Sequence, residues 1–428
     1  MSLGVKIQIK RWTEVHHLPK EKEIRTFALV LFLEIVLFIC ALKIFTEDHL
    51  PTDFLQFYAA GKILDSNPPV RLYDLQLQYE LQRRTYPLLS KERAYIYAGP
   101  PLLAFAFRPL SWLPYRLAFT VWAAASLALY LNALLLLRPG KQTLMALLIA
   151  ASFPPFVLFC LRMGQLSTIG VFSFAACIWA ERQHKPFCSG LLLSICTYKP
   201  TLLIIAVPML VIGRRYRTVL GFLSGLLTLA IVSLACVGFA TCRAYVETLL
   251  IYGGIISGEG RKQLLDMYVD LNASLRMLFM DHLWIVTPIL LAFSCAALWY
   301  LGCAWARSPK SSSTTNVLWA ATIAFTLVFN VYVPIYDAIL MVPAAFLLFA
   351  GAWGELTSQV RHPASRAIKL SFVLIYLIAF ASRSLVSVLH CQVLTIALLI
   401  PAILSIRLLR SGNDARALES DMQGTAVS

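Results

Sequence analysis

"LLLSICTYKPTLLIIAVP", residues 191–208, decides how the chain is threaded, because it places a lysine and a proline in the middle of an apolar run. If 187–213 formed one membrane span, the basic segment 214–217 would lie on the same side of the membrane as Asp53. Basic segments favour the cytoplasmic side, and the residue before a proline is disfavoured in a helix. We therefore expect two short helices that enter the membrane and return to the same side, with Lys199 at the turn.

The composition is that of an integral membrane protein. Of the 428 residues, 59% are hydrophobic and 14% are charged, against roughly 25% charged residues in soluble domains. Most of the Lys and Arg residues lie near the ends of apolar segments, where basic residues set topology and meet anionic lipid. The net charge of +15 is therefore interpreted as a membrane feature, and we expect no nucleic-acid partner. The ten cysteines form no Cys-x-x-C pair, which favours small buried side chains over disulfides or metal ligands.

Apolar segments recur along the whole chain and predict an all-α polytopic bundle. The segments of full span length are 26–46, 115–137, 217–240, 283–305 and 388–410. Shorter or interrupted ones are 143–160, 166–182, 314–331, 335–353 and 366–385. With the broken segment 187–213 they give about twelve spans and two cytoplasmic termini. We expect a single transmembrane domain, 1–410, and a polar cytoplasmic tail, 411–428.

The extracytoplasmic side receives two long loops in this topology, about 47–114 and 241–282. In the first loop, Leu72, Leu75 and Tyr79 have helical spacing, which predicts an amphipathic helix at the interface. The Pro-rich "AGPP", residues 98–101, indicates a rigid segment, either a lid or a loop that leads into a span.

The same side collects the polar residues that we consider as a candidate site: Asp53, Tyr58, Arg162, Gln165, Lys199, Asn272, Arg276, Tyr336, Asp337 and Arg383. Asp53 lies in "PTDFLQFYAAG", residues 51–61, beside three aromatic residues. A partly dry carboxylate can accept a proton from a hydroxyl nucleophile as a general base. An aspartate there also caps an interfacial helix that starts at Phe54, and the two interpretations are compatible.

Lys199 is a lysine inside an apolar stretch, which favours a functional role such as holding an anionic phosphate. The alternative is that its side chain reaches the membrane surface. Arg162, Arg276 and Arg383 are rival cations for the phosphate.

Two further motifs have both a structural and a functional interpretation. "RMGQLS", residues 162–167, predicts a turn at Gly164-Gln165 that begins a span, and a helix cap explains it equally well. Tyr336-Asp337 begins a later span, where an acid is favourable in any case. The sequence has no G-x-x-x-x-G-K-[ST], G-x-G-x-x-G or H-E-x-x-H motif, so ATP-driven transport and zinc proteolysis lose support.

Six motifs follow one another in an order that resembles glycosyltransferase family 87, the polyprenyl-phosphate-mannose-dependent mannosyltransferases of the GT-C fold. They are DFLQFYAAGKILDSNPPVRLYD (53–74), YIYAGPPLLAFAFRPLSWLPYRLAFTVW (95–122), RMGQLS (162–167), SGLLLSICTYKP (189–200), LNASL (271–275) and YVPIYDAILMVP (332–343). They are spread over most of the length of the chain. The sequence departs from the family at Ala98-Gly99, which separate Tyr97 from the Pro-Pro pair, and at Ser167, where Asn is common.

The resemblance implies an inverting membrane enzyme that moves a hexose, mannose by analogy, from a polyprenyl-phosphate sugar to a lipid or glycan acceptor. It implies Asp53 as the general base and Lys199 as a phosphate contact. No second acid stands two residues after Asp53, so we expect chemistry without a metal or other cofactor. The expected location is a cell membrane, taken as a bacterial inner membrane, with the site on the extracytoplasmic face.

A polytopic transporter or lipid flippase is the competing hypothesis, because it too needs charges and broken helices in the membrane. The polar residues gather at one face rather than at the midplane, and no inverted repeat is evident, which favours the enzyme. A purely structural membrane partner would leave the shared polar face unexplained.

Overall fold

The computed structural model describes residues 53–87, 89, 94–137, 143–257, 265–279, 282–308, 311–349 and 363–407. The described chain is helical and contains no sheet, only an isolated bridge between Tyr268 and Pro334. Its elements are α3 (Asp53–Ser66), η1 (Pro69–Tyr73), α4 (Leu75–Thr85), α5 (Pro101–Ser111), α6 (Tyr115–Leu137), α7 (Thr143–Ala151), η4 (Phe156–Leu161), α8 (Ser167–Arg182), α9 (Pro186–Ser194), η5 (Ile195–Tyr198), η6 (Pro200–Leu203), α10 (Ala206–Ile212), α11 (Tyr216–Ser257), α12 (Leu271–Phe279), α13 (Leu283–Arg307), α14 (Ser312–Val328), η8 (Ile335–Leu340), α15 (Met341–Phe349) and α17 (Pro363–Leu389). An apolar helix over Val393–Arg407 follows them.

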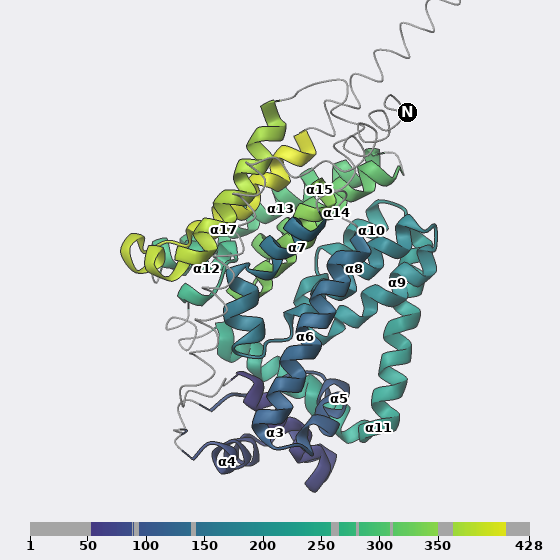
Figure 1. The fold of residues 1–428 in the computed structure, drawn as a ribbon, viewed down its shortest axis with the longest axis vertical. Coiled ribbons are helices and arrows are strands. Elements are labelled where there is room, and N and C mark those ends of the chain that lie inside the picture. The colour runs from purple at the N-terminus through teal and green to yellow at the C-terminus, as the bar shows by residue number, and fades with distance from the viewer. Residues whose placement is uncertain are drawn as a thin grey trace, which may run out of the picture.

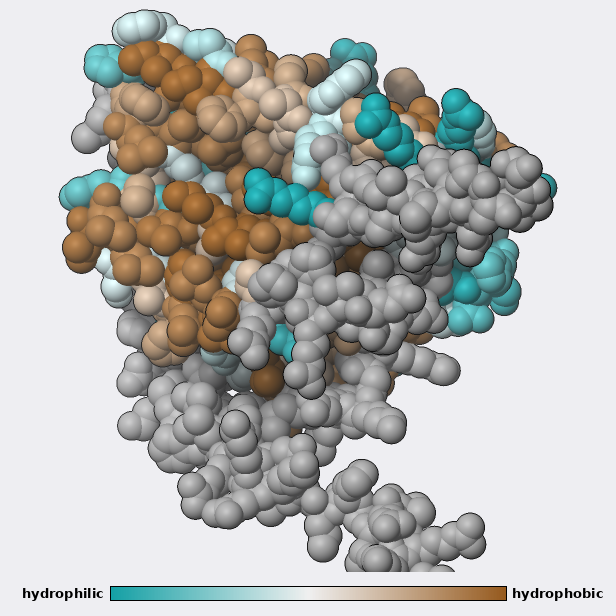
Figure 2. Space-filling model, turned by 90° about the horizontal axis from the view of Figure 1, so that it is seen from above, coloured by the Kyte–Doolittle hydropathy of each residue, from teal (hydrophilic) through white to brown (hydrophobic). Residues whose placement is uncertain are grey.

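Four of these helices are long and apolar enough to cross a membrane: Tyr115–Leu137, Tyr216–Ile251, Trp284–Arg307 and Ala367–Leu389. Five shorter apolar helices accompany them, as expected for a multi-pass membrane protein. Large apolar side chains on the long helices point outward, and apolar surface covers much of the described face in Figure 2. The last two spans differ from the sequence prediction, because the long helix is α17 and the apolar helix after it is short.

The total of about twelve spans and the GT-C arrangement stay predictions. The predicted first span, 26–46, and the polar tail, 411–428, lie outside the described residues.

The broken segment around Lys199 has the predicted form. α9 and α10 are separated by the two 3₁₀ turns η5 and η6, which meet at Lys199-Pro200. Close approaches of Gly190 to the Thr218 carbonyl and of Gly221 to the Phe187 carbonyl bring the start of α9 against the start of α11. Since α10 ends just before α11 begins, the chain enters and returns to the same end.

The described helices of the first loop form a small head at one end of the bundle, where α3, α4 and α5 lie together (Figure 1). Its aromatic core includes Phe54, Phe57, Tyr97 and Phe107. The Pro-rich segment starts α5, with Pro101 in its first turn, where a proline costs no hydrogen bond. The head therefore holds α3, and with it Asp53, against the bundle.

The predicted amphipathic helix exists, but it begins later and buries a different face. Asp74 caps α4 by accepting a hydrogen bond from the Leu77 amide at 3.1 Å. Leu75, predicted to face the apolar side, is exposed, while Gln78 and Gln82 are buried. The two glutamines pair with the backbone of Tyr95 and Tyr97 through both their amide N–H and C=O groups, so the buried polar atoms are satisfied.

Candidate active site

The first turn of α3 carries Asp53 onto a turn that joins η4 to α8. The Phe54 amide donates a hydrogen bond to the Met163 carbonyl at 2.9 Å. Gly164 in this turn has φ +73°, and a Cβ there would lie 2.6 Å from the Cβ of Phe54. Only glycine fits both the backbone conformation and the space. The Trp122 indole fixes the turn further by donating to the Gly164 carbonyl at 3.0 Å.

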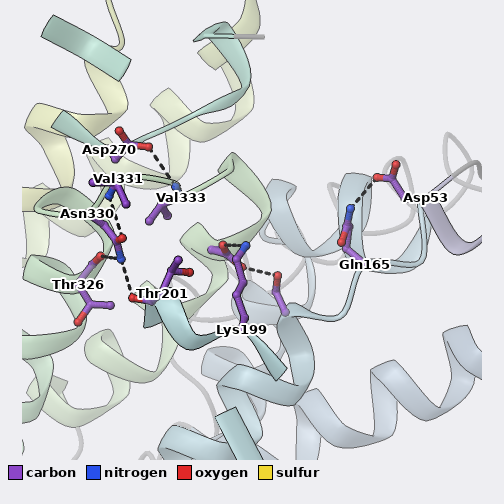
Figure 3. Close-up of polar contacts among 11 residues, drawn as sticks. Asp53, Gln165, Lys199, Thr201, Asp270, Thr326, Asn330, Val331 and Val333 are labelled. Atoms are coloured by element: carbon purple, nitrogen blue, oxygen red, sulfur yellow. Dashed lines mark hydrogen bonds and ion pairs between the residues drawn. The ribbon is translucent and has the colours of Figure 1, made fainter. Parts of the chain in front are cut away.

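Gln165 follows this glycine and holds the carboxylate of Asp53. Its Nε2 donates to Oδ2 of Asp53 at 2.8 Å, as Figure 3 shows. The Gln165 side chain is buried and Asp53 is partly buried. Burial raises the pKa of Asp53 to about 6, although the hydrogen bond from Gln165 lowers it. The carboxylate is thus ionised at neutral pH while its proton affinity is that of a competent general base.

Aromatic side chains form the wall behind Asp53. The Phe54 ring packs against Tyr115 and Phe119, with centroids 5.7 and 5.5 Å apart. Tyr58 meets Tyr115 edge-on at 5.2 Å and donates its hydroxyl to the Leu113 carbonyl at 2.9 Å. Tyr58 is buried, which raises its pKa, and its hydroxyl is occupied, so its role in the described structure is to shape the wall.

A second charged group lies beside this turn. The Lys199 ammonium forms an ion pair with Oδ2 of Asp337, whose side chain is 0% exposed. Ser167, the first residue of α8, donates its hydroxyl to Oδ1 of Asp337 at 2.7 Å. The Lys199 ammonium also lies 4.8 and 5.5 Å from the ring centroids of Tyr336 and Tyr332. The break between α9 and α10 therefore buries a cation that is compensated by a carboxylate and two aromatic faces.

Tyr336 lies on η8 next to Asp337, and its ring centroid is 4.8 Å from the Lys199 ammonium. Its side chain is partly exposed. Gln165 and Ser167, two residues apart at the start of α8, thus bring the Asp53-Gln165 and Lys199-Asp337 pairs to the same end of that helix. Figure 3 shows the contacts of Gln165 and Lys199.

A partly dry carboxylate beside an aromatic wall can act as a general base toward a hydroxyl. The sequence model of glycosyltransferase family 87 matches residues 95–334, more than half of the chain. The chain belongs to glycosyltransferase family 87. No curated protein and no solved structure matches it. Family 87 membership makes the protein a transferase, as predicted, and sets the transporter hypothesis aside.

The family 87 match contains Arg162, Gln165, Lys199, Asn272 and Arg276. It begins after the opening motif, so Asp53 and Tyr58 lie before it, while Tyr336, Asp337 and Arg383 lie beyond its end. The case for Asp53 in this glycosyltransferase therefore rests on the geometry around Gln165.

The three arginines predicted for the site differ in their contacts within the described structure of the glycosyltransferase. Arg162 ends η4, is partly buried and has no hydrogen-bonding or ion-pair partner for its guanidinium among the described residues. Arg276 donates its Nε to Oδ1 of Asn272 at 3.1 Å, one turn earlier on α12. Arg383 is exposed on α17, and no contact in the described chain joins it to the site.

Two residues of the glycosyltransferase that matter for the site escaped the sequence analysis. Asp270 is fully buried, accepts from the amides of Ala273 and Val333 at 2.9 and 3.0 Å, and so ties α12 to the segment before η8. Asn330 fastens that segment to the broken helix by donating to the Thr201 carbonyl at 2.8 Å. An acid three residues before a helical amide is a capping pattern, so Asp270 left a signal in the sequence.

Proposed function

We propose that this family 87 glycosyltransferase moves a hexose, mannose by analogy, from a polyprenyl-phosphate sugar to a lipid or glycan acceptor, with inversion and with Asp53 as the general base. The observation that carries the proposal is the hydrogen bond from Gln165 to a partly buried Asp53 whose pKa is raised to about 6.

Asp53 has one oxygen committed and one available. Gln165 binds Oδ2, and no other described residue hydrogen-bonds the Asp53 carboxylate, so in this proposal Oδ1 accepts the proton of the acceptor hydroxyl. In the reaction the acceptor hydroxyl oxygen bonds to the anomeric carbon from the side opposite the phosphate. The bond between the anomeric carbon and the phosphate oxygen breaks, the hydroxyl proton passes to Asp53, and polyprenyl phosphate leaves with the bonding electrons.

The leaving phosphate needs positive charge, and we assign this to Arg162. Lys199 is paired with the buried Asp337, so the charges of that pair largely cancel. The guanidinium of Arg162 has no such partner in the described chain and sits three residues before Gln165. A planar guanidinium matches phosphate oxygens with two parallel N–H donors. Lys199 is the alternative phosphate contact, because an ammonium has three donors and its bond to Asp337 uses one of them.

The site belongs on the extracytoplasmic face in this proposal. The opposite end of α8 carries a basic cluster, in which Arg215 pairs with Glu181 at 2.9 Å and Arg182 donates to Asn316 at 2.9 Å. The 16 residues of α8 span roughly 24 Å at about 1.5 Å per residue. Positive charge favours the cytoplasmic side, which supports an extracytoplasmic position for Asp53.

Transfer in a purified system tests the proposal. The protein in liposomes is incubated with polyprenyl-phosphate [³H]mannose and a membrane lipid extract, and labelled product is separated from donor. We expect label in an acceptor lipid or glycan for the wild type and not for boiled protein. Absence of transfer from any polyprenyl-phosphate hexose, with donor binding intact, would contradict the donor class.

A further inference from the structure

Two carboxylates of the site are joined by one short turn. Gln165 donates to Asp53 at 2.8 Å, and Ser167, two residues later, donates to Asp337 at 2.7 Å. The two acids belong to segments that are far apart in the sequence, α3 and η8. The turn is therefore clamped between a partly exposed carboxylate and a fully buried one.

We infer that Gln165 is a positioning residue for Asp53, and that Ser167, Asp337 and Lys199 form the anchor that keeps Gln165 in place. The inference rests on the proposed function, because it needs Asp53 to be the base. Gln165 then orients the Asp53 carboxylate, instead of contacting the substrate as the sequence analysis expected.

The anchor is suited to this task because every part of it is restrained. Asp337 is 0% exposed, and its two oxygens are used, one by Ser167 and one by Lys199. Lys199 is held at the break between two short helices and between two tyrosine rings. Loss of the Asp337 side chain would remove the acceptor of the Ser167 hydroxyl and so one restraint on the start of α8, two residues after Gln165.

Gln165 itself is restrained on its other side. Gly164 packs against Phe54, and the Phe54 amide is bonded to Met163. The chain on either side of the Gln165 amide is thus fixed relative to Asp53, so the hydrogen bond selects one carboxylate orientation and leaves Oδ1 for the acceptor.

Other charged and titratable groups lie on the elements that pack around Asp53. They are Tyr58 and Lys62 on α3, Tyr115 on α6, Tyr336 and Asp337 on η8, Lys199 paired with Asp337, Arg162 before the turn, Arg108 paired with Asp65, and Arg71 paired with Asp74. Among these groups Asp53 is the one that the proposed reaction uses as a base, so the acid side of the rate profile should report Asp53.

The test is the pH profile of kcat at saturating donor in the full-length protein. In the wild type kcat rises through pH about 6, the pKa of Asp53. Gln165→Met removes the hydrogen-bond donor that favours the charged Asp53 carboxylate. In this variant the acid limb, the low-pH side of the kcat profile on which kcat rises with pH, should therefore move to higher pH by half a unit or more. A half-unit rise from a pKa of about 6 lowers the ionised fraction at pH 7 by only about 1.2-fold, so the expected fall in kcat of at least threefold at pH 7 comes mainly from the misoriented carboxylate. The small titration part should be regained at pH 8, and the donor KM should be unchanged. Gln165→Glu, which adds a second carboxylate, moves the limb further.

Ser167→Ala tests the anchor, and Thr168→Val is its matched control. Thr168 is the next residue on α8, and its buried hydroxyl bonds to Ser126 at 2.7 Å rather than to Asp337. Ser167→Ala should shift the acid limb in the same direction as Gln165→Met, and Thr168→Val should leave it in place. A variant that only folds poorly has less active protein, but its acid limb stays at the wild-type pH. The profile therefore distinguishes a misplaced Gln165 from a loss of stability.

The two hypotheses fail in different ways. Wild-type turnover in Asp53→Asn overturns the proposed base, and the positioning role falls with it. An inactive Asp53→Asn together with an unmoved acid limb in Gln165→Met and Gln165→Glu overturns the positioning role alone. A limb that moves equally in Ser167→Ala and Thr168→Val overturns the anchor.

Discussion

Lys199 and Asp337 form an ion pair between the break in a membrane-entering segment and the start of a later helix, 138 residues along the chain. Asp337 has no exposed side-chain area, so the pair joins two discontinuous helices inside the protein. Discontinuous helices are tolerated in a membrane where they line a protein interior, and here their polar groups meet each other. The pair explains why a lysine occurs in an apolar stretch: its charge is compensated by Asp337, so the side chain does not need to reach the membrane surface.

Removal of one partner of this pair should cost far more than removal of both. Lys199→Met leaves Asp337 buried without a counter-charge, which should lower the free energy of unfolding by about 3–5 kcal/mol. Asp337→Asn should cost a similar amount. The double variant should lose clearly less than the sum, because no uncompensated charge remains. Thermal unfolding of the four proteins in one detergent measures the coupling, and additive losses would contradict a direct pair.

Arg162 should control affinity for the donor. Loss of a hydrogen bond to a charged group costs about 1.5–3 kcal/mol, so Arg162→Met should raise the donor KM roughly tenfold to a hundredfold with little change in melting temperature. Arg217→Met, an exposed arginine at the far end of the bundle, is the matched control and should leave KM unchanged. Equal donor KM values for the wild type and Arg162→Met would contradict a phosphate contact by Arg162 and would favour Lys199 as that contact.

Asp53 should destabilise the protein at neutral pH, which a simple helix cap would not do. Its folded pKa of about 6 lies above the ordinary aspartate value of 3.8. Between these values the folded state binds more protons, so stability falls as pH rises through that window. Asp53→Asn should then be more stable than the wild type at pH 7, by about 1–3 kcal/mol, and the gain should vanish near pH 4. A less stable Asp53→Asn at pH 7 would favour the cap.

Gly164 should be intolerant of any side chain. Gly164→Ala meets both a positive φ and Phe54 at 2.6 Å, so it should destabilise the protein by at least about 1–3 kcal/mol and reduce kcat by displacing Gln165. Gly238→Ala is a matched control, because Gly238 also has a positive φ but nothing within 4 Å of an added Cβ. If both variants lose turnover equally, the close packing at Phe54 is not what positions Gln165.

The orientation of the protein can be read from cysteine labelling in intact cells. Ser66, at the exposed end of α3, is expected outside, so Ser66→Cys should react with an impermeant maleimide. Native Cys188, exposed near the start of α9, is expected inside and should react only after permeabilisation. The reverse pattern would place Asp53 in the cytoplasm.

The sequence predicted those parts of the structure that depend on local chemistry. The Lys199-Pro200 pair predicted the helix break, since proline acts on its immediate neighbour. Composition and apolar segments predicted a helical membrane protein, and the ordered motifs predicted the family. Asp53, Gln165, Lys199 and Asp337 were predicted to share one face; the described structure pairs Asp53 with Gln165 and Lys199 with Asp337, and their shared role stays a prediction.

Contacts between residues that are far apart in the sequence could not be predicted from local sequence patterns. Gln165 bonds to Asp53 across 112 positions and Ser167 to Asp337 across 170, because a glycine turn and a buried pair bring those segments together. The buried face of α4 was predicted wrongly, since periodicity counts apolar residues and cannot anticipate that Gln78 and Gln82 pair with a neighbouring backbone.

Turnover of Asp53→Asn is the most direct test of the account. Asparagine keeps the size of the side chain and an oxygen that can accept the Gln165 hydrogen bond, but it cannot take the acceptor proton. With wild-type donor binding, measured on the same preparation, kcat should fall by about 10²–10⁴. Turnover within a few-fold of wild type would contradict Asp53 as the general base.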